Sequence, residues 1–323
     1  MKKGIKNALI GGSILAGVTA VAAGISALIT KTLVDEALER EEPKIMIKAK
    51  ERISGGEIDS EILNHANECS EKLKSIEMQT VEIESFDGTK LIGHLYPADN
   101  AKRIIVAMHG WRSNWWRDFA VIYDFWHDSG CTVLFAEQRG QGESEGDRMG
   151  FGMIERYDCA EWVKWLCEND QDKLPIYLAG VSMGAATVLM AAGLELPDNV
   201  HGIMADCGFT TASAVWKHVA EDNLHLSFDI RKRLVDALCK KRINIGSDEY
   251  STVDAMRENT VPVLFIHGTA DSFVPVSMTY ENYEACKAEK RLLIVEGAEH
   301  GLSYIVDKDA YQKAVLEFFK DFD

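Results

Sequence analysis

Six short apolar segments in the second and third parts of the chain restrict most strongly what it can fold into. Each is continuous rather than alternating and is rich in Val, Ile or Leu, which is typical of strands buried on both faces of a mostly parallel sheet. Segments with helical periodicity, such as 157–168 and 183–194, lie between them. This alternation predicts an α/β sandwich with a central sheet flanked by helices. The predicted strands are 103–108, 132–136, 176–179, 202–205, 263–266 and 292–295.

A β-hairpin is predicted to open the domain. Residues 80–85 alternate apolar and polar side chains, Asp87-Gly88 is a strong turn sequence, and residues 90–96 return. The segment before it, 31–78, is polar and helix-prone, and we interpret it as a helical spacer. The domain itself is therefore expected to span 79–323.

One long interval, 209–258, contains no buried-strand pattern. It has several short helical stretches and two basic triplets, at 231–233 and 240–242. An insertion of this size between two sheet strands is interpreted as a helical cap over the carboxyl edge of the sheet, where open α/β folds bind ligands.

The first thirty residues combine a basic start with a long uncharged run. Lys2, Lys3 and Lys6 precede residues 7–30, which contain no charged side chain. The run reaches the roughly 20 apolar residues that cross a bilayer as a helix. We therefore predict a single-pass anchor in 1–30 that contacts the membrane through 7–30. A signal peptide cleaved near residues 20–22 (Ala-Val-Ala) is the alternative.

The charges around this run favour two different orientations. The three lysines before it favour a cytoplasmic N-terminus, but basic residues after it favour the opposite. Seven scattered cysteines, with no C-x-x-C pair, are typical of unpaired structural thiols in a reducing compartment. Because a short N-terminal tail usually stays inside, we expect the folded domain to face outside the cytoplasm. The basic residues after the run are Lys31, Arg40, Lys44, Lys48 and Lys50.

The formal net charge of −16 argues against nucleic acid as a partner, because a chain this acidic repels a phosphate backbone. No metal-ligand spacing is present among the cysteines. The oligomeric state is not indicated by any pattern.

The pentapeptide Gly180-Val181-Ser182-Met183-Gly184 lies between a predicted strand and a predicted helix. The G-x-S-x-G pattern alone arises often by chance, and the strand before it and the helix after it make it specific. Both glycines are needed because the strained turn leaves no room for side chains. We predict that Ser182 is a nucleophile at the positive end of the helix.

A serine needs a neighbouring base to attack at neutral pH. His300 lies in a Gly-flanked loop directly after the last predicted strand, and Asp271 follows the strand before it. Both are expected at the same sheet edge as Ser182, in the chain order serine, aspartate, histidine. Asp206, after the strand 202–205, is the competing acid.

Two backbone N–H groups are expected to stabilise negative charge that develops on a substrate oxygen. One belongs to Met183, directly after the nucleophile. The other belongs to Trp111, in the loop after the strand 103–108, and its side chain is expected to form a wall of the pocket.

Five blocks in this order resemble the α/β-hydrolase superfamily: 109–111 (His-Gly-Trp), 137–144, the serine pentapeptide, 267–275 and 300–301. Within it, residues 79–323 resemble the serine aminopeptidase and monoacylglycerol-lipase-like branch, including its membrane-tethered members. The resemblance implies the α/β-hydrolase fold, a capped pocket and a triad of Ser182, Asp271 and His300. Glu137 departs from the aspartate common in relatives, at a position that is usually structural. Arg139 and Ser144 are expected to brace that loop.

These observations together predict a serine hydrolase that cleaves a carboxylic ester or thioester of a hydrophobic acyl substrate through an acyl-enzyme. The substrate is expected to be a small or lipid-like molecule, and the mechanism needs no metal and no organic cofactor. A serine aminopeptidase-like peptidase is the first alternative. A non-catalytic binding protein on the same fold is the second.

Overall fold

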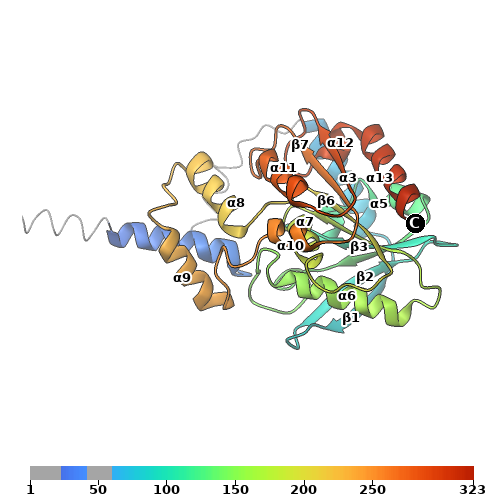
Figure 1. Cartoon of the computed structure of the whole chain (residues 1–323), viewed down its shortest axis with the longest axis horizontal. Coiled ribbons are helices and arrows are strands. Elements are labelled where there is room, and N and C mark those ends of the chain that lie inside the picture. The colour runs from blue at the N-terminus through green and yellow to red at the C-terminus, as the bar shows by residue number, and fades with distance from the viewer. Residues whose placement is uncertain (1–22, 42–59) are drawn as a thin grey trace, which may run out of the picture.

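The computed structural model describes residues 23–41 and 60–323. A sheet of eight strands in the order β1-β2-β4-β3-β5-β6-β7-β8 runs through the middle of the molecule (Figure 1). β2 pairs antiparallel with β1 and β4, and every other pair of neighbours is parallel, which confirms the predicted mostly parallel sheet. The strands are β1 (Gln79–Glu84), β2 (Lys90–Tyr96), β3 (Arg103–Met108), β4 (Cys131–Ala136), β5 (Ile176–Val181), β6 (Val200–Asp206), β7 (Val263–Gly268) and β8 (Lys290–Val295).

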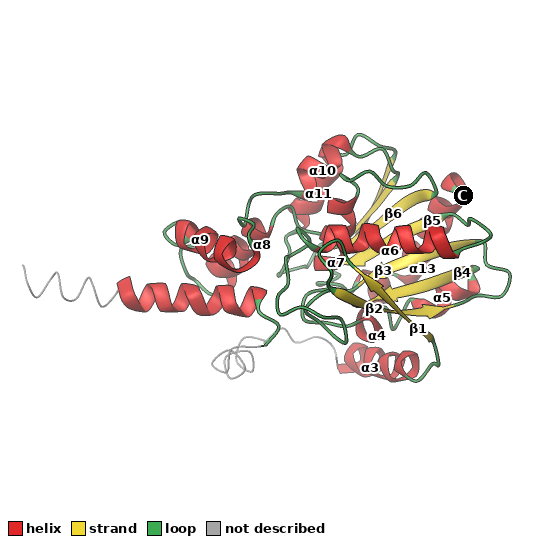
Figure 2. Ribbon diagram, turned by 90° about the horizontal axis from the view of Figure 1, so that it is seen from below, coloured by secondary structure: helices red, strands yellow, loops and turns green. Residues whose placement is uncertain are grey.

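Helices cover both faces of this sheet (Figure 2). One face is covered by α6 (Glu155–Asn169), α7 (Met183–Ala191), α10 (Thr252–Glu258) and α11 (Val276–Ala285). The other face is covered by α3 (Ser60–Lys74), α4 (Trp115–Asp118), α5 (Tyr123–Asp128), α12 (Ser303–Val306) and α13 (Lys308–Phe322).

Strand β3 explains why the sequence pattern of the central strands is continuous rather than alternating. All six of its residues are buried. Ile104 and Val106 belong to the core under α6 and α7, whereas Ile105 and Ala107 belong to the core under α5 and α13. Since successive side chains of a strand point to opposite faces, both faces demand apolar residues here.

The chain between β6 and β7 forms four helices. Its first three helices are α8 (Ala212–His218), the π-helix η1 (Val219–Asn223) and α9 (Lys232–Ile243). Their buried side chains form a separate cluster with those of the helix at residues 23–38. α10 differs, because its Ala255 and Met256 pack into the core under the sheet. We refer to α8, η1 and α9 as the cap.

The helix at residues 23–38 lies beside α9 at one end of the molecule (Figures 1 and 2). Thr30, Val34 and Leu38 on this helix are at most 3% exposed, whereas Ile25 and Leu28 are 56% and 65% exposed. Most of the predicted anchor, residues 1–22, lies outside the described residues. Within the described part of the chain, no helix is both long and apolar enough to cross a membrane.

All seven cysteines are unpaired, in agreement with the expected structural thiols. Burial raises the pKa of the Cys131 thiol to about 11 and that of Cys159 to about 12. Both side chains therefore stay protonated and act as small core residues.

Candidate active site

Ser182 occupies the sharp turn between β5 and α7. Its φ of +56° and ψ of −116° are strained for a residue with a side chain. The turn fits only because the residues two before and two after it are glycines. A Cβ on Gly180 would lie 2.3 Å from the Gly184 backbone, and one on Gly184 would lie 1.8 Å from the Met108 carbonyl oxygen. Close packing of α7 against β3 and β5 thus requires both glycines.

The structure brings Ser182, Asp271 and His300 together at the carboxyl edge of the sheet. The Ser182 Oγ lies 2.9 Å from His300 Nε2, and His300 Nδ1 lies 2.7 Å from Asp271 Oδ2. Asp271 follows β7 and His300 follows β8. Gly297 and Gly301 have φ of +75° and +69°, values that glycine adopts without strain, so the loop can turn back toward Ser182. The three side chains form one hydrogen-bonded chain.

Asp271 is held as a carboxylate by several donors. Its Oδ1 accepts hydrogen bonds from the backbone N–H groups of Phe273 at 2.9 Å and Val274 at 2.8 Å. Its Oδ2 lies 3.1 Å from His267 Nε2 in addition to His300. Burial by itself raises the pKa of this carboxyl group, but the hydrogen bonds from His267 and His300 outweigh burial and hold it well below its usual range. Asp271 therefore stays charged, as the partner of an imidazolium must.

The competing acid, Asp206, does not contact His300 by a hydrogen bond. It ends β6, and its Oδ1 accepts a hydrogen bond from Ser303 Oγ at 3.0 Å. Burial raises the pKa of Asp206 to about 6, against 3.8 for an ordinary aspartate. Two neighbouring aspartates at this edge thus have pKa values that are shifted in opposite directions.

The two expected backbone donors belong to the residue after Ser182 and to the loop after β3. Met183 is the first residue of α7, where a backbone N–H has no partner within the helix. The loop after β3 that contains Trp111 is fixed by Asp118, whose Oδ2 accepts from the Gly110 N–H at 2.6 Å and whose Oδ1 accepts from Ser113 Oγ at 2.5 Å. A Cβ on Gly110 would lie 3.5 Å from the Ser182 Cβ, so the loop passes directly beside the serine.

The helix at 23–38 is bonded to this same loop, a contact that the sequence patterns did not reveal. The Trp111 indole Nε1 donates to the Ala37 carbonyl at 2.9 Å. The Arg112 guanidinium donates to the carbonyls of Glu36 at 2.8 Å and Glu39 at 2.6 Å. The last carbonyls of a helix need outside donors, and Arg112 supplies them. The spacing of buried Val34, Ala37 and Leu38 is the one signal in the sequence that this helix packs against something.

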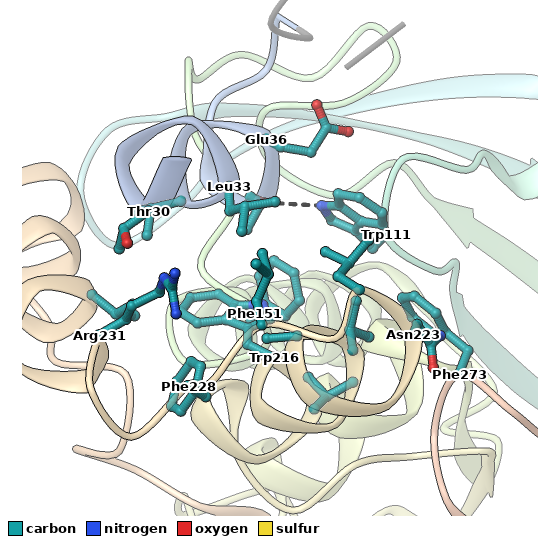
Figure 3. A pocket seen from close by; sticks show the side chains of 18 of the residues that line it. Thr30, Leu33, Glu36, Trp111, Phe151, Trp216, Asn223, Phe228, Arg231 and Phe273 are labelled. Carbon is teal, nitrogen blue, oxygen red and sulfur yellow. Dashed lines mark hydrogen bonds between the residues drawn. The ribbon is translucent and has the colours of Figure 1, made fainter. Parts of the chain in front are cut away.

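Between this helix and the cap lies a cavity of about 470 Å³ (Figure 3). Its walls are mostly apolar, and Leu33, Phe151, Trp216 and Phe228 are among them. Phe273 closes one end and its ring centroid lies 5.1 Å from that of His300, so the cavity adjoins the triad. The Trp111 side chain forms part of the wall, where it was expected.

The loop after β4 is held by contacts with the body of the domain and does not line the cavity. Glu137 accepts from His94 Nε2 at 2.9 Å and from Trp115 Nε1 at 3.2 Å. Ser144 Oγ donates to the Glu137 carbonyl at 2.7 Å, and Arg139 forms an ion pair with buried Asp158. These contacts are structural, which is the role expected for Glu137, Arg139 and Ser144.

Cys207 Sγ, Asp271 and His300 place their ligand atoms within 4.8 Å of one another, close enough to share a metal ion. Both ring nitrogens of His300 already face hydrogen-bonding partners, however, and burial raises the pKa of the Cys207 thiol well above its ordinary value. Metal binding would have to deprotonate the thiol and break the serine–histidine–aspartate chain. The arrangement is suited instead to moving a proton between Ser182 and His300.

Known proteins share sequence and fold with this chain. The family model described as serine aminopeptidase, S33, matches residues 99–239, which include the loop after β3 and Ser182. The chain is similar to the uncharacterised protein YqkD of Bacillus subtilis (strain 168), at 29% identity over 79% of this chain and 83% of that protein.

Two solved structures share the fold. The Pyrococcus furiosus esterase Pf2001 matches with a TM-score of 0.62 and 24% identity, over 78% of this chain and 93% of the esterase. Est1E of Butyrivibrio proteoclasticus, solved with ferulic acid, matches with a TM-score of 0.58 and 20% identity, over 75% and 98% of the two chains. The eight-stranded sheet and these structural neighbours show that the chain has the α/β-hydrolase fold, and residues 99–239 match the family model described as serine aminopeptidase, S33.

Proposed function

We propose that this hydrolase cleaves carboxylic esters or thioesters of a hydrophobic acyl substrate, with Ser182 as the nucleophile. The observation that carries the proposal is the hydrogen-bonded chain from Ser182 through His300 to Asp271, at 2.9 and 2.7 Å, beside an apolar cavity. An apolar cavity with a few convergent polar groups at one end is the usual form of a small-molecule site. The esterases among the structural neighbours also support ester hydrolysis.

The proposed reaction has two halves. His300 Nε2 takes the proton of Ser182 Oγ as the oxygen attacks the substrate carbonyl carbon, and the N–H groups of Met183 and Trp111 bind the resulting oxyanion. His300 then returns the proton to the departing alcohol or thiol, which leaves an acyl-enzyme. Water attacks this ester by the same route and releases the acid. Asp271 keeps the imidazole in the required tautomer and balances its charge.

An aminopeptidase-like activity is the second candidate, because the matching family model is described as a serine aminopeptidase. Such an enzyme needs a carboxylate to hold the free amino group of its substrate. Glu36 is the acidic residue among the described residues that line the cavity, and it lies 3.4 Å from the Arg112 guanidinium in an ion pair. An engaged carboxylate is a poor amine receptor, so the cavity favours an acyl ester over a peptide.

A fluorophosphonate probe, followed by a panel of p-nitrophenyl esters and aminoacyl p-nitroanilides, tests this proposal. We expect the probe to label the wild-type protein and the esters to be hydrolysed faster than the anilides. Ser182→Ala should abolish both labelling and hydrolysis. Ser272→Ala is the matched control, because this serine borders the cavity without contacting His300. Labelling of Ser182→Ala at the wild-type level would overturn the proposal.

We also propose that the protein is attached to a membrane through residues 7–29, with its folded domain outside the cytoplasm. The uncharged run supports this, as do the exposed Ile25 and Leu28 at its end. A span cannot extend to Thr30, because Thr30 is 1% exposed and lines the cavity. Cell fractionation with a carbonate wash, and protease treatment of intact cells, test attachment and orientation. Recovery in the soluble fraction would contradict the attachment.

A further inference from the structure

The cavity beside the triad has a cationic far end. Figure 3 shows Phe273 at one end of the cavity and Arg231 with Thr30 at the other. Arg231 directly precedes α9, and Glu36 is the other charged residue in the described lining. The negative charge of Glu36 is already matched by Arg112, at 3.4 Å. A molecule that fills the cavity from its Phe273 end, beside His300, therefore ends at the Arg231 guanidinium.

This guanidinium has unused hydrogen-bonding capacity. Its Nη1 donates to the Ser227 carbonyl at 2.5 Å, which holds the side chain in place, but its buried Nε has no partner in the described part of the chain. The Nε1 of Trp216, which lines the same cavity, is likewise buried and unpartnered among the described residues. Buried donors without acceptors are costly, and native proteins rarely keep them unless a ligand or water completes them.

The carboxylates near Arg231 in sequence are bound to other cations. Asp229 lies 3.0 Å from Lys217 Nζ, and Asp248 lies 2.7 Å from Lys232 Nζ. No described carboxylate forms an ion pair with Arg231 itself. This is unusual in a chain with a net charge of −16, where acidic residues outnumber basic ones by 51 to 35. Such a protein repels anions in general, so an anionic group enters only where a local cation attracts it.

We propose that the cavity binds an ester whose apolar chain ends in an anionic oxygen group, a carboxylate or a phosphate, and that Arg231 and Trp216 bind this group. The proposal rests on the proposed function, because it takes Ser182 as the point at which the ester carbonyl lies. A planar guanidinium with free N–H donors suits both carboxylate and phosphate oxygens. The substrate is thus apolar in the middle and charged at the end remote from the cleaved bond.

Matched p-nitrophenyl esters test this specificity. Each pair has the same chain length, and the chain ends either in a free carboxylate or in a methyl group; a third ester ends in a phosphonate. At the chain length that reaches Arg231, we expect the wild-type enzyme to favour a charged ester over the methyl-ended one. Arg231→Met should lower this ratio of kcat/KM values by about ten- to hundredfold, mainly through KM. Arg231→Lys should retain part of it.

Arg233→Met is the control, since Arg233 is an exposed arginine in the same basic triplet and does not line the cavity. It should leave the ratio unchanged. Equal ratios in wild type and Arg231→Met, or the same loss in Arg233→Met, would overturn the anionic subsite while Ser182-dependent hydrolysis of the methyl-ended esters still supported the proposed function. Whether the carboxylate or the phosphonate ester is preferred decides which group the subsite is built for.

A binding measurement keeps the inference testable if no ester is hydrolysed. Calorimetric titration of the full-length protein with decanoate, decyl phosphate and decanol compares the same chain with and without an anionic end. We expect at least one of the two anions to bind more tightly than decanol, and Arg231→Met to remove most of that difference. If decanol binds as tightly as both anions, or if Arg231→Met binds the anions as the wild type does, the subsite does not exist.

Discussion

The two sides of the candidate site are held in place in different ways. On the triad side, Ser182, Asp271 and His300 follow the ends of β5, β7 and β8, whose pairing runs through the hydrogen-bonded sheet. On the cap side, the helix at 23–38 is joined to α9 by side chains: Arg242 forms ion pairs with Asp35 and Glu39, which lie 207 and 203 residues away in sequence.

This difference separates chemistry from selectivity. The side that would perform the reaction is positioned by the backbone hydrogen bonds of the sheet. Each triad residue follows the end of a strand, so the sheet fixes where its side chain lies. The side that would choose the substrate is positioned by a few ion pairs, by packing around a cavity and by a short backbone link outside the sheet, in which the Met149 N–H donates to the Leu38 carbonyl and the Arg40 N–H to the Asp147 carbonyl. Substitutions on the triad side should therefore change kcat, whereas those on the cap side should change the preference for one acyl chain over another.

Asp271→Asn should have the largest effect, on the triad side. An amide at this position donates to His300 Nδ1 instead of accepting from it, so the imidazole is held in the wrong tautomer. We expect kcat for a short p-nitrophenyl ester to fall by about four orders of magnitude. Asp206→Asn, which changes the neighbouring acid, should lower kcat far less. The opposite ranking of the two variants would show that Asp206 is the working acid. Circular dichroism checks that both variants are folded.

Asp206→Asn should also reveal that the pKa of this second aspartate is shifted in the opposite direction to that of Asp271. Because burial raises the folded-state pKa of Asp206 to about 6, from 3.8, the native protein binds its proton more tightly than the unfolded chain does. Its contribution to stability is full below about pH 4 and is lost as pH rises through about 6. A difference of about 2 between the pKa values in the folded and unfolded states corresponds to about 3 kcal/mol of folding stability.

The asparagine variant is neutral at every pH and avoids this loss. The free energy of unfolding of the variant, minus that of the wild type, should therefore increase by up to about 3 kcal/mol as the pH rises from about 4 to 8. Urea titrations at both pH values measure the difference. A difference between the two proteins that does not vary with pH would mean that folding does not raise the pKa of Asp206, and would remove the contrast with Asp271.

Leu33→Trp should have the smallest effect and tests the cap side. Leu33 lines the cavity, so a larger side chain shortens the space for an acyl chain. We expect kcat/KM for a long-chain ester to fall by about tenfold while that for the acetate changes little. Leu28→Trp makes the same change on the same helix at a side chain that is 65% exposed, and should alter neither value. Equal losses for both esters would mean that the cap side also supports the chemistry.

The sequence patterns were most informative where position follows from local structure. The six apolar segments and the hairpin correspond to β1 to β8, with ends displaced by up to two residues. Ser182, Asp271 and His300 lie near one another because parallel strands all end at one edge, and each of these residues follows such an end. In the structure, the turn that follows Asp271 donates two backbone N–H groups to its carboxylate.

The patterns were least informative on the cap side. Residues 31–41, inside the segment interpreted as a spacer, contact the loop after β3 and the cap through Arg112 and Arg242. No spacing in the sequence connects Arg112 with the carbonyl of Glu39, because a side chain that caps a distant helix leaves no periodic trace. In the sequence, Arg231 stood out only as part of a basic triplet. Its position at the end of a cavity depends on segments far apart in the chain, among them the helix at 23–38 and the cap.

The sheet, the strand ends and the residues that follow them could be predicted from sequence alone, because apolar patterns are local and parallel strands all end at one edge. The cavity enclosed by the helix at 23–38 and the cap, with Thr30 in its wall and Arg231 at its far end, became apparent only in the folded molecule. These features depend on side-chain contacts between segments far apart in the chain. Such contacts form only when folding brings the segments together, so they leave no local pattern in the sequence.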